Sequence, residues 1–414
     1  MSECSETFKK ELNSPDLKSG MLSATCALAS TNPEQFLDEL DWSVAETLDA
    51  IASPALQDGF ATSFHDKSWY ESWLSTLGKN ARLCILVGEF ANTPLIAFPL
   101  CVQKSWNHTK ASFIASDVSD YNHPLMHEVL ARHASPEFYQ AMWCKIGSLI
   151  PEADILSLRK LLNDPGPGCG RAIWYPSRVE AEASHHTNLS GDWAENQGRF
   201  FGKSSRKSLL RKEKKLSQAG EITYRNIVGK AARTNAIKTL SVWKSHQLRN
   251  LGLVNPFISG DFQRFLSQIV QTGDADTYRI YGMYAGETPL ALTLMICHGD
   301  RWFLYQTAYT NQEAGKYSPG LSLLREILRR AHDEGCTVFD FGLGNEGYKK
   351  KYCDKNLTLY RSEMALTTKG WVAKAYFDGA LAARRLAKSN KKIEAGALSM
   401  LQLLANFRRP KRQT

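Results

Sequence analysis

The order of apolar segments and turns repeats once along this chain, about 190 residues apart. Each copy is predicted to form three strands, a helix that opens with Ser-Pro, and one more strand, and the second strand of both copies starts at Thr-Pro-Leu. Proline suits a first helical turn, where its missing N–H needs no partner. The predicted strands and helix starts lie at residues 83–87, 95–102, 111–115, Ser135-Pro136 and 154–161, and again at residues 278–283, 290–297, 301–308, Ser318-Pro319 and 337–341. The shared order predicts an α/β (α+β) protein, a tandem of two modules whose mixed, mostly antiparallel sheets are flanked by helices.

We expect four segments along the chain. Residues 1–56 carry isolated prolines and mixed polarity, and are expected to form a loosely ordered leader. The first module is expected over residues 57–180 and the second over residues 181–365, with a run of proline and glycine at residues 163–170 marking the break. Residues 366–414 are expected to form a basic helical tail.

Charge is concentrated in two places. The formal net charge is +9, yet residues 199–215 hold eight basic side chains and one acid, and residues 384–414 hold nine basic side chains and one acid. The rest of the chain is therefore mildly acidic. The first basic segment predicts a helix that binds nucleic acid, faces a charged donor or is simply solvated. The second carries a short apolar stripe, and either touches a membrane surface or packs on its own domain.

The cysteines and the hydropathy indicate the compartment. Nine cysteines are scattered singly without a Cys-x-x-Cys pair, which favours a reducing environment. The N-terminus lacks a basic start followed by an apolar run, and no stretch approaches the roughly 20 apolar residues that span a bilayer. We expect a cytoplasmic protein without a signal peptide or transmembrane segment. The histidines lack the spacing of metal ligands, so no metal site is expected.

The richest local motif is the strand and turn from Phe339 to Tyr352. Strand alternation places Asp340 on the face opposite its two phenylalanine neighbours. A carboxylate in mid-strand is costly unless it is bonded or used, so Asp340 is either a general base or a cap for the N–H groups of the following turn. Glu346 is a second candidate base, and Lys349 is predicted to neutralise phosphates of a bound ligand unless the lysine run is only a solvated face.

A second candidate site is the helix start at Tyr317, Ser318 and Gly320. Free N–H groups and the positive end of the helix dipole attract phosphate, and glycine lets a phosphate approach the backbone closely. The alternative is an ordinary helix start led by proline.

The stretch YSPGLSLLREILRRAHDEGCTVFDFGLGNEGYKKKY, residues 317–352, resembles the bacterial GNAT-fold family known as CelD-like, or cellulose-biosynthesis, acetyltransferases, which are relatives of the Fem peptidyltransferases. The resemblance extends over residues 64–352. It implies two GNAT-like modules and an N-acyltransferase that moves an acyl group from acyl-CoA, such as acetyl-CoA, to an amine acceptor in envelope polysaccharide or cell-surface biosynthesis. No permanently bound cofactor is implied.

The same resemblance assigns roles to residues. The pyrophosphate of the acyl-CoA would sit on the helix start, and Tyr348 would protonate the departing thiolate. The polar turn with Asp120 and Tyr121 would contact the amine acceptor, a glycan or a small molecule, although an Asx-rich turn explains it nearly as well. Two alternatives stay open: Fem-like transfer from aminoacyl-tRNA, and a non-catalytic partner of a polysaccharide machine.

Overall fold

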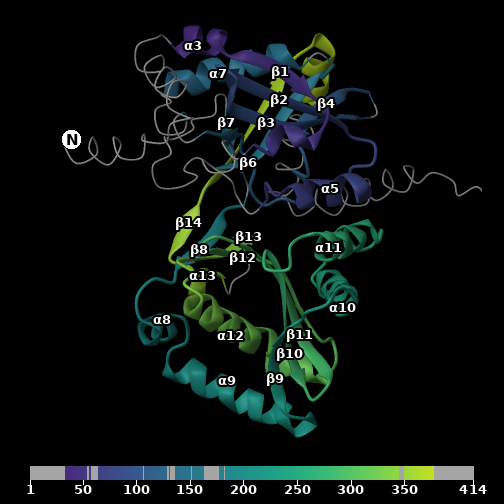
Figure 1. Ribbon diagram of the computed structural model, residues 1–414. Helices are drawn as coiled ribbons and strands as arrows, with labels where there is room; N and C mark the ends of the chain where they lie inside the picture. The colour runs from purple at the N-terminus through teal and green to yellow at the C-terminus, as the bar shows by residue number, and fades with distance from the viewer. Residues whose placement is uncertain are drawn as a thin grey trace, which may run out of the picture.

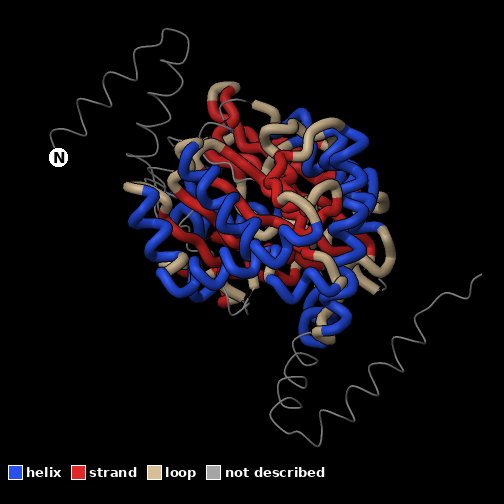
Figure 2. Tube along the Cα trace, turned by 90° about the horizontal axis from the view of Figure 1, so that it is seen from below, coloured by secondary structure: helices blue, strands red, loops and turns tan. Residues whose placement is uncertain are grey.

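The computed structural model describes residues 33–53, 56, 64–105, 107–127, 130, 136–150, 152–162, 177–180, 182–344 and 349–376. They form two sheets, each flanked by helices, which lie one above the other in Figure 1. Seen from below, strands run through the middle of the molecule and helices lie outside them (Figure 2). The mixed α/β architecture with two modules is thereby confirmed.

The first sheet has eight strands in the described part of the chain. Helices α3 (Pro33–Glu39) and α7 (Pro136–Leu149) pack on one face, and η1 (Leu48–Ile51) and α5 (Lys67–Thr76) on the other. Only β4 and β6 pair in parallel, because α7 crosses between them. The order is β1 (Asp41–Ala45), β2 (Arg82–Phe90), β3 (Thr93–Lys104), β4 (Thr109–Phe113), β6 (Ile155–Leu162), β15 (Leu359–Ala365) and β7 (Ser177–Val179), with β5 (Leu125–Met126) on β3.

The second sheet has seven described strands. Helices α10 (Lys230–Asn250) and α11 (Asp261–Thr272) cover one face, and α8 (Trp193–Phe200), α9 (Lys203–Leu216) and α12 (Pro319–Asp333) the other. Short helices η2 (Ser217–Ala219), η3 (Glu313–Tyr317) and α13 (Lys349–Tyr352) lie in connections. The order is β14 (Lys355–Leu357), β8 (Ser184–Asn188), β13 (Val338–Leu343), β12 (Arg301–Tyr309), β11 (Thr288–His298), β10 (Tyr278–Ala285) and β9 (Ile222–Asn226).

The two modules repeat each other down to the register of their hairpins. Pro94 pairs with Glu89 in the first hairpin and Pro289 with Tyr284 in the second, and each hairpin has a bulge one residue before that pair. The predicted equivalence of the two Thr-Pro-Leu turns is confirmed. β12 and β13 are parallel and joined by α12, as β4 and β6 are joined by α7.

Strands from outside the range expected for the first module complete its sheet. β1 comes from the segment expected as a leader, and β15 comes from the end of the range expected for the second module. β15 lies between β6 and β7 and pairs with both. Local sequence patterns do not predict that a strand so far along the chain joins this sheet. The chain therefore passes from the first sheet to the second between Val179 and Ser184, and returns to the first sheet at Thr358.

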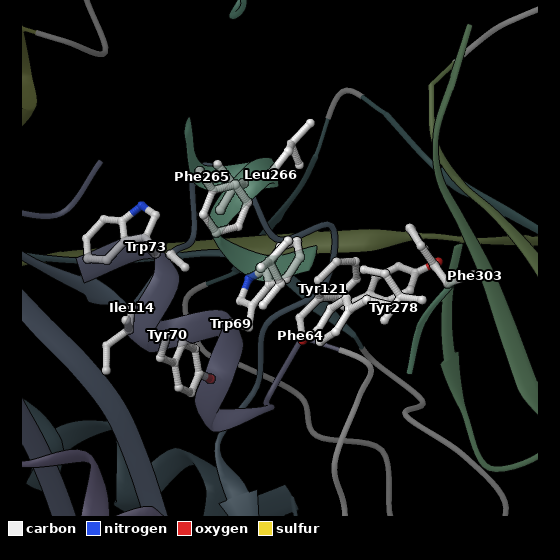
Figure 3. Packing of buried hydrophobic residues seen from close by; sticks show 14 of the residues in the cluster. Phe64, Trp69, Tyr70, Trp73, Ile114, Tyr121, Phe265, Leu266, Tyr278 and Phe303 are labelled. Carbon is white, nitrogen blue, oxygen red and sulfur yellow. The ribbon is translucent and has the colours of Figure 1, made fainter. Parts of the chain in front are cut away.

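One aromatic core is shared by both modules (Figure 3). Trp69 of α5 is fully buried, with its ring 4.8 Å from Phe265 of α11 and 5.2 Å from Tyr305 of β12. Tyr278 of the second sheet donates a hydrogen bond of 2.7 Å to Asp66, the N-cap of α5. Trp69 and Trp73 are four residues apart, a spacing that by itself predicts one buried face of a helix, and both rings are buried.

Candidate functional site

The candidate site begins where β12 and β13 separate. These parallel strands pair only over residues 301–303 and 338–340. Tyr305 is the extra residue of a bulge in β12, which bends the strand at the point where pairing stops. Beyond it, β12 continues to Tyr309 with no pairing to β13 in the described part of the sheet. Backbone groups along this edge of β12 therefore have no partner in β13 among the described residues, and we call this separation of the two strands the gap.

The equivalent gap in the first module is filled by its own chain. β4 and β6 pair over two residues, and then Asn122 forms a parallel bridge with Leu161. The N–H of Asn122 donates to the carbonyl of Lys160 at 3.0 Å. The two modules thus differ at this place, because no such bridge joins the chain between β12 and β13 among the described residues.

Helix α12 begins close to the end of β12. Its N-cap, Ser318, has a left-handed backbone (φ +58°) and makes no side-chain cap, and Pro319 has no N–H to offer. The ammonium of Lys212 from α9 donates to the Ser318 hydroxyl at 2.8 Å. A Cβ on Gly320 would lie 3.3 Å from the ring of Tyr309, so this glycine also serves close packing against that ring.

Tyr317, which precedes the helix start, is half-buried, and the ammonium of Lys316 lies 5.1 Å from its ring centroid. The three residues predicted to hold a donor therefore lie together, and the structure adds Lys212 as a cation beside them.

Asp340 is fully buried at the boundary between the modules. Its Oδ1 accepts from the backbone N–H of Gly342 at 2.8 Å and from the hydroxyl of Ser184 at 3.4 Å. Its Oδ2 accepts from the Tyr121 hydroxyl at 2.7 Å and from the guanidinium of Arg301 at 3.3 Å. Both oxygens are engaged, and the cap of the turn that the sequence offered as one alternative is present.

Tyr121 belongs to the first module and reaches across to the second. Its hydroxyl also bonds Ser184, and burial beside Asp340 raises the pKa of Tyr121 well above its ordinary value. The ring lies 5.7 Å from Phe303 of β12. The predicted acceptor residue is thus held inside the contact between modules.

Asp120, its neighbour, stands at the edge of the gap. Its Oδ2 accepts from the N–H of Leu343 at 3.0 Å, and the hydroxyl of Tyr305 donates to the carbonyl of Val118 at 2.8 Å. The turn with Asp120 therefore spans from β12 to β13. Burial raises the pKa of Asp120, and the nearby Lys160 ammonium and the Leu343 N–H oppose that rise. The other carboxylate oxygen has no partner within the described residues.

The turn after β13 is described only in part. Lys349 is 3% exposed, and its ammonium donates to the carbonyls of Gly342 and Leu343. It would have to leave these carbonyls to meet a phosphate. Glu346 and Tyr348 lie outside the described residues.

Three members of this polar cluster were not predicted from the sequence: Ser184, His186 and Arg301. His186 pairs with Asp340 across β8 and β13, and burial lowers its pKa. Its Nδ1 is buried and has no partner in the described part of the chain. One sequence feature could have indicated the cluster: β8 consists of polar residues only. A buried strand of this kind is stable only if its side chains form hydrogen bonds with other parts of the protein.

The described residues include neither a metal-binding cluster nor a membrane-spanning helix. No group of three His, Cys, Asp or Glu residues there is arranged to hold a metal ion. No described helix combines the length and apolarity that crossing a membrane requires.

Residues 203–350 match the acetyltransferase (GNAT) domain family. Among solved structures, the chain is similar to FemX, with 10% identity and a TM-score of 0.51 over 77% of this chain and 96% of that one. Two further similar structures are a tandem GNAT protein from the clavulanic acid biosynthesis pathway (11% identity, TM-score 0.44, covering 80% and 99%) and L-PGS from Bacillus licheniformis (11%, 0.44, covering 77% and 97%). No curated protein matches the sequence.

The matched domain contains β12, α12 and β13, and the similarity to FemX extends over most of the chain. Together with the repeated hairpins, this identifies a duplicated GNAT fold and a GNAT acetyltransferase domain in the second module. Membership in the CelD-like family is not established by these matches.

Proposed function

We propose that this protein transfers an acyl group from acyl-CoA to an amine. The observation that carries the proposal is the gap between β12 and β13, with the start of α12 near its open end and the whole arrangement inside the matched GNAT domain. A gap between strands offers an extended thioester the free backbone groups of one strand. A helix start nearby offers N–H groups to its phosphates.

The donor would lie with its pyrophosphate on the N–H of Gly320 and the ammonium of Lys212, beside Tyr317 and Ser318. Its thioester carbonyl would then face the unpaired edge of β12. Backbone N–H groups along that edge would stabilise the negative oxygen of the tetrahedral intermediate. Because both strands are fixed in a sheet, these donors need no reorganisation during the reaction.

The acceptor would arrive on the side of the first module, where Asp120 borders the gap. Asp120 would take a proton from the ammonium of the acceptor, and the resulting amine would attack the thioester carbon. A C–N bond forms, the C–S bond breaks, and the thiolate of CoA leaves with the proton of Tyr348. The Tyr348 phenolate then takes the second proton of the attacking nitrogen, and Asp120 returns its proton to solvent. Glu346 is the reserve base in this scheme, and Tyr121 and Asp340 would position the turn that carries Asp120. The resemblance to CelD-like enzymes suggests a glycan or small-molecule amine.

Only the second module would bind a donor. In the first module the equivalent gap is bridged by Asn122. Glu137 stands in the sequence where Gly320 stands in the second module, and the next residue, Phe138, is buried in the core. One donor per chain is therefore expected.

Isothermal titration calorimetry with acetyl-CoA tests the donor site. Lys212→Met should weaken binding at least ~10-fold, since it removes a charge-assisted bond to phosphate. Gly320→Val should weaken it further, because the added side chain blocks the backbone and presses on Tyr309. Lys238→Met, which removes an exposed cation from α10, is the matched control and should bind as the parent does.

Two donors per chain, or unchanged affinity in both site variants, would contradict the proposal. Stabilisation by aminoacyl-tRNA without stabilisation by acyl-CoA would favour the Fem-like alternative, for which the basic α9 is the supporting observation.

A further inference from the structure

Every charged side chain on the exposed face of α9 is a cation. Five basic residues of this helix are exposed, and none of them has an ion-pair partner within the described residues. Their spacing of three or four places most of them on one face. They are Lys203, Lys207, Arg211, Lys214 and Lys215.

The one acid of α9 is turned away from that face. Glu213 accepts from the guanidinium of Arg325 at 2.9 Å and from the hydroxyl of Tyr224 at 3.1 Å. Lys212 is also turned inward, to Ser318. Since the inward charges are satisfied within the protein, the exposed ones are available to an outside partner.

Exposed apolar side chains accompany these charges. Leu210 lies among the cations of α9 and is 57% exposed. The connection from α10 to α11 exposes Val254 to 92% and Ile258 to 75%, and Leu251 and Leu253 are exposed as well, while the buried Phe257 anchors this connection to the core. The surface of a soluble protein rarely carries so many exposed aliphatic side chains close together.

Both features flank the start of α12. Lys212 of α9 contacts Ser318, Gly320 lies against the ring of Tyr309, and the carbonyl of Tyr309 accepts from Gln247 in the last turns of α10 at 2.9 Å. The apolar connection begins one turn after Gln247. The basic face and the apolar connection therefore lie at the end of the second sheet that carries the start of α12, one on each face of that sheet.

We propose that this end of the molecule docks on an anionic phospholipid surface. Lysine and arginine side chains would meet the headgroups, and the aliphatic side chains would enter the interface between headgroups and acyl chains. A nucleic acid would satisfy the charges only. A single strand would also stack on exposed aromatic rings, whereas α9 contains none and the connection buries its single ring. A duplex would contact the cations through its phosphates and leave the aliphatic side chains in water.

The test is co-sedimentation of the full-length chain with vesicles, which needs no donor or acceptor. Vesicles with about 30% phosphatidylserine in phosphatidylcholine should bind the protein, and pure phosphatidylcholine should bind it far less. The variant K203Q/K207Q/R211Q/K214Q should lower the partition coefficient at least ~100-fold, because each basic residue near an anionic surface contributes roughly fivefold. V254S/I258S should lower it at least ~10-fold and leave the remaining binding sensitive to salt.

The matched control is K79Q/K104Q/K230Q/K238Q, which makes the same charge change at exposed lysines elsewhere. It should bind vesicles as the parent does. Both quadruple variants should keep the parent melting temperature and the parent affinity for acetyl-CoA, which separates this proposal from the donor site. Equal losses in the two quadruple variants, undiminished binding by the α9 variant, or loss of acetyl-CoA or tRNA binding in place of vesicle binding would overturn it.

Discussion

Two aspartates lie at the same boundary between modules, and their surroundings differ. Asp340 is fully buried and receives four hydrogen bonds, including one from the guanidinium of Arg301. Within the described residues Asp120 receives one, from the N–H of Leu343. A carboxylate whose lone pairs are all taken is a poor proton acceptor, whereas one with a free oxygen and a raised pKa suits general base catalysis. The base role predicted for Asp340 from the sequence stays a prediction, and its contacts favour positioning.

Asp120→Asn and Asp340→Asn should therefore behave differently. Asp120→Asn should lower turnover about 100-fold or more and remove the acidic limb of the pH–rate profile, since the rate should fall as pH drops through the raised pKa of Asp120. The fold should keep its stability, because protonation of a carboxyl with a raised folded pKa favours the folded state. Steady-state kinetics over pH and urea unfolding provide the measurements.

Asp340→Asn should instead lower the free energy of unfolding by about 1–3 kcal/mol, the cost of leaving buried donors without an acceptor, and should retain the acidic limb. If Asp340→Asn instead abolishes turnover and the acidic limb of the pH–rate profile, and leaves the free energy of unfolding unchanged, Asp340 is the general base.

At the level of elements, strand β13 and the turn of the first module fit together closely. Gly342 has φ +69°, and a Cβ there would lie 2.8 Å from the Asp120 carboxylate and 2.8 Å from the ring of Phe303. Only glycine allows both the left-handed backbone and this approach. The contact holds the turn with Asp120 across the ends of β12 and β13.

Gly342→Ala should be destabilised by about 1–3 kcal/mol more than Gly286→Ala. Gly286 also has a positive φ (+57°), but a Cβ there would meet nothing within 4 Å, so it carries the backbone strain without the clash. Urea denaturation of both variants measures the difference. Equal destabilisation would show that the turn is not packed against β13 as described.

At the level of the whole molecule, the modules are joined by more than a linker. The chain crosses between the sheets twice, since β15 returns to the first sheet after β14 has paired in the second. Trp69 and the rings around it form one core from both modules, and Tyr121 bonds Asp340 over a separation of 219 residues. Helix α5 of the first module packs on α11 of the second within this shared core, so the two modules should unfold together.

Trp69→Ala should lower the free energy of unfolding by about 3–5 kcal/mol, the usual cost of truncating a buried aromatic side chain. Both modules should unfold in one transition. Near-ultraviolet and far-ultraviolet circular dichroism, recorded during urea denaturation, measure this transition. Trp371→Ala, at a ring that is 67% exposed, is the control and should change stability by less than about 0.5 kcal/mol. Two separate transitions, with one unmoved by Trp69→Ala, would contradict a shared core.

Local patterns in the sequence determined the repeat, the paired hairpins, the buried face of Trp69 and Trp73 and the start of α12. Each of these features depends on periodicity, turn chemistry or capping within a few residues. Segments far away in the sequence are not needed to recognise them. The same patterns placed Asp340 on the polar face of its strand and marked the turn with Asp120 and Tyr121.

Tertiary structure alone decided which of these elements meet. Arg301, Ser184 and Tyr121 converge on Asp340 because β8, β12 and the first module surround β13, and β15 enters the first sheet because β6 has an unpaired edge. Strand pairing is made by backbone N–H and C=O groups, which every residue except proline carries. The pattern of side chains along a strand therefore does not show which strand will pair with it. The buried face of α9 was likewise set by packing on α12 and η3, and that packing left its cations and the aliphatic connection of α10 and α11 exposed to solvent.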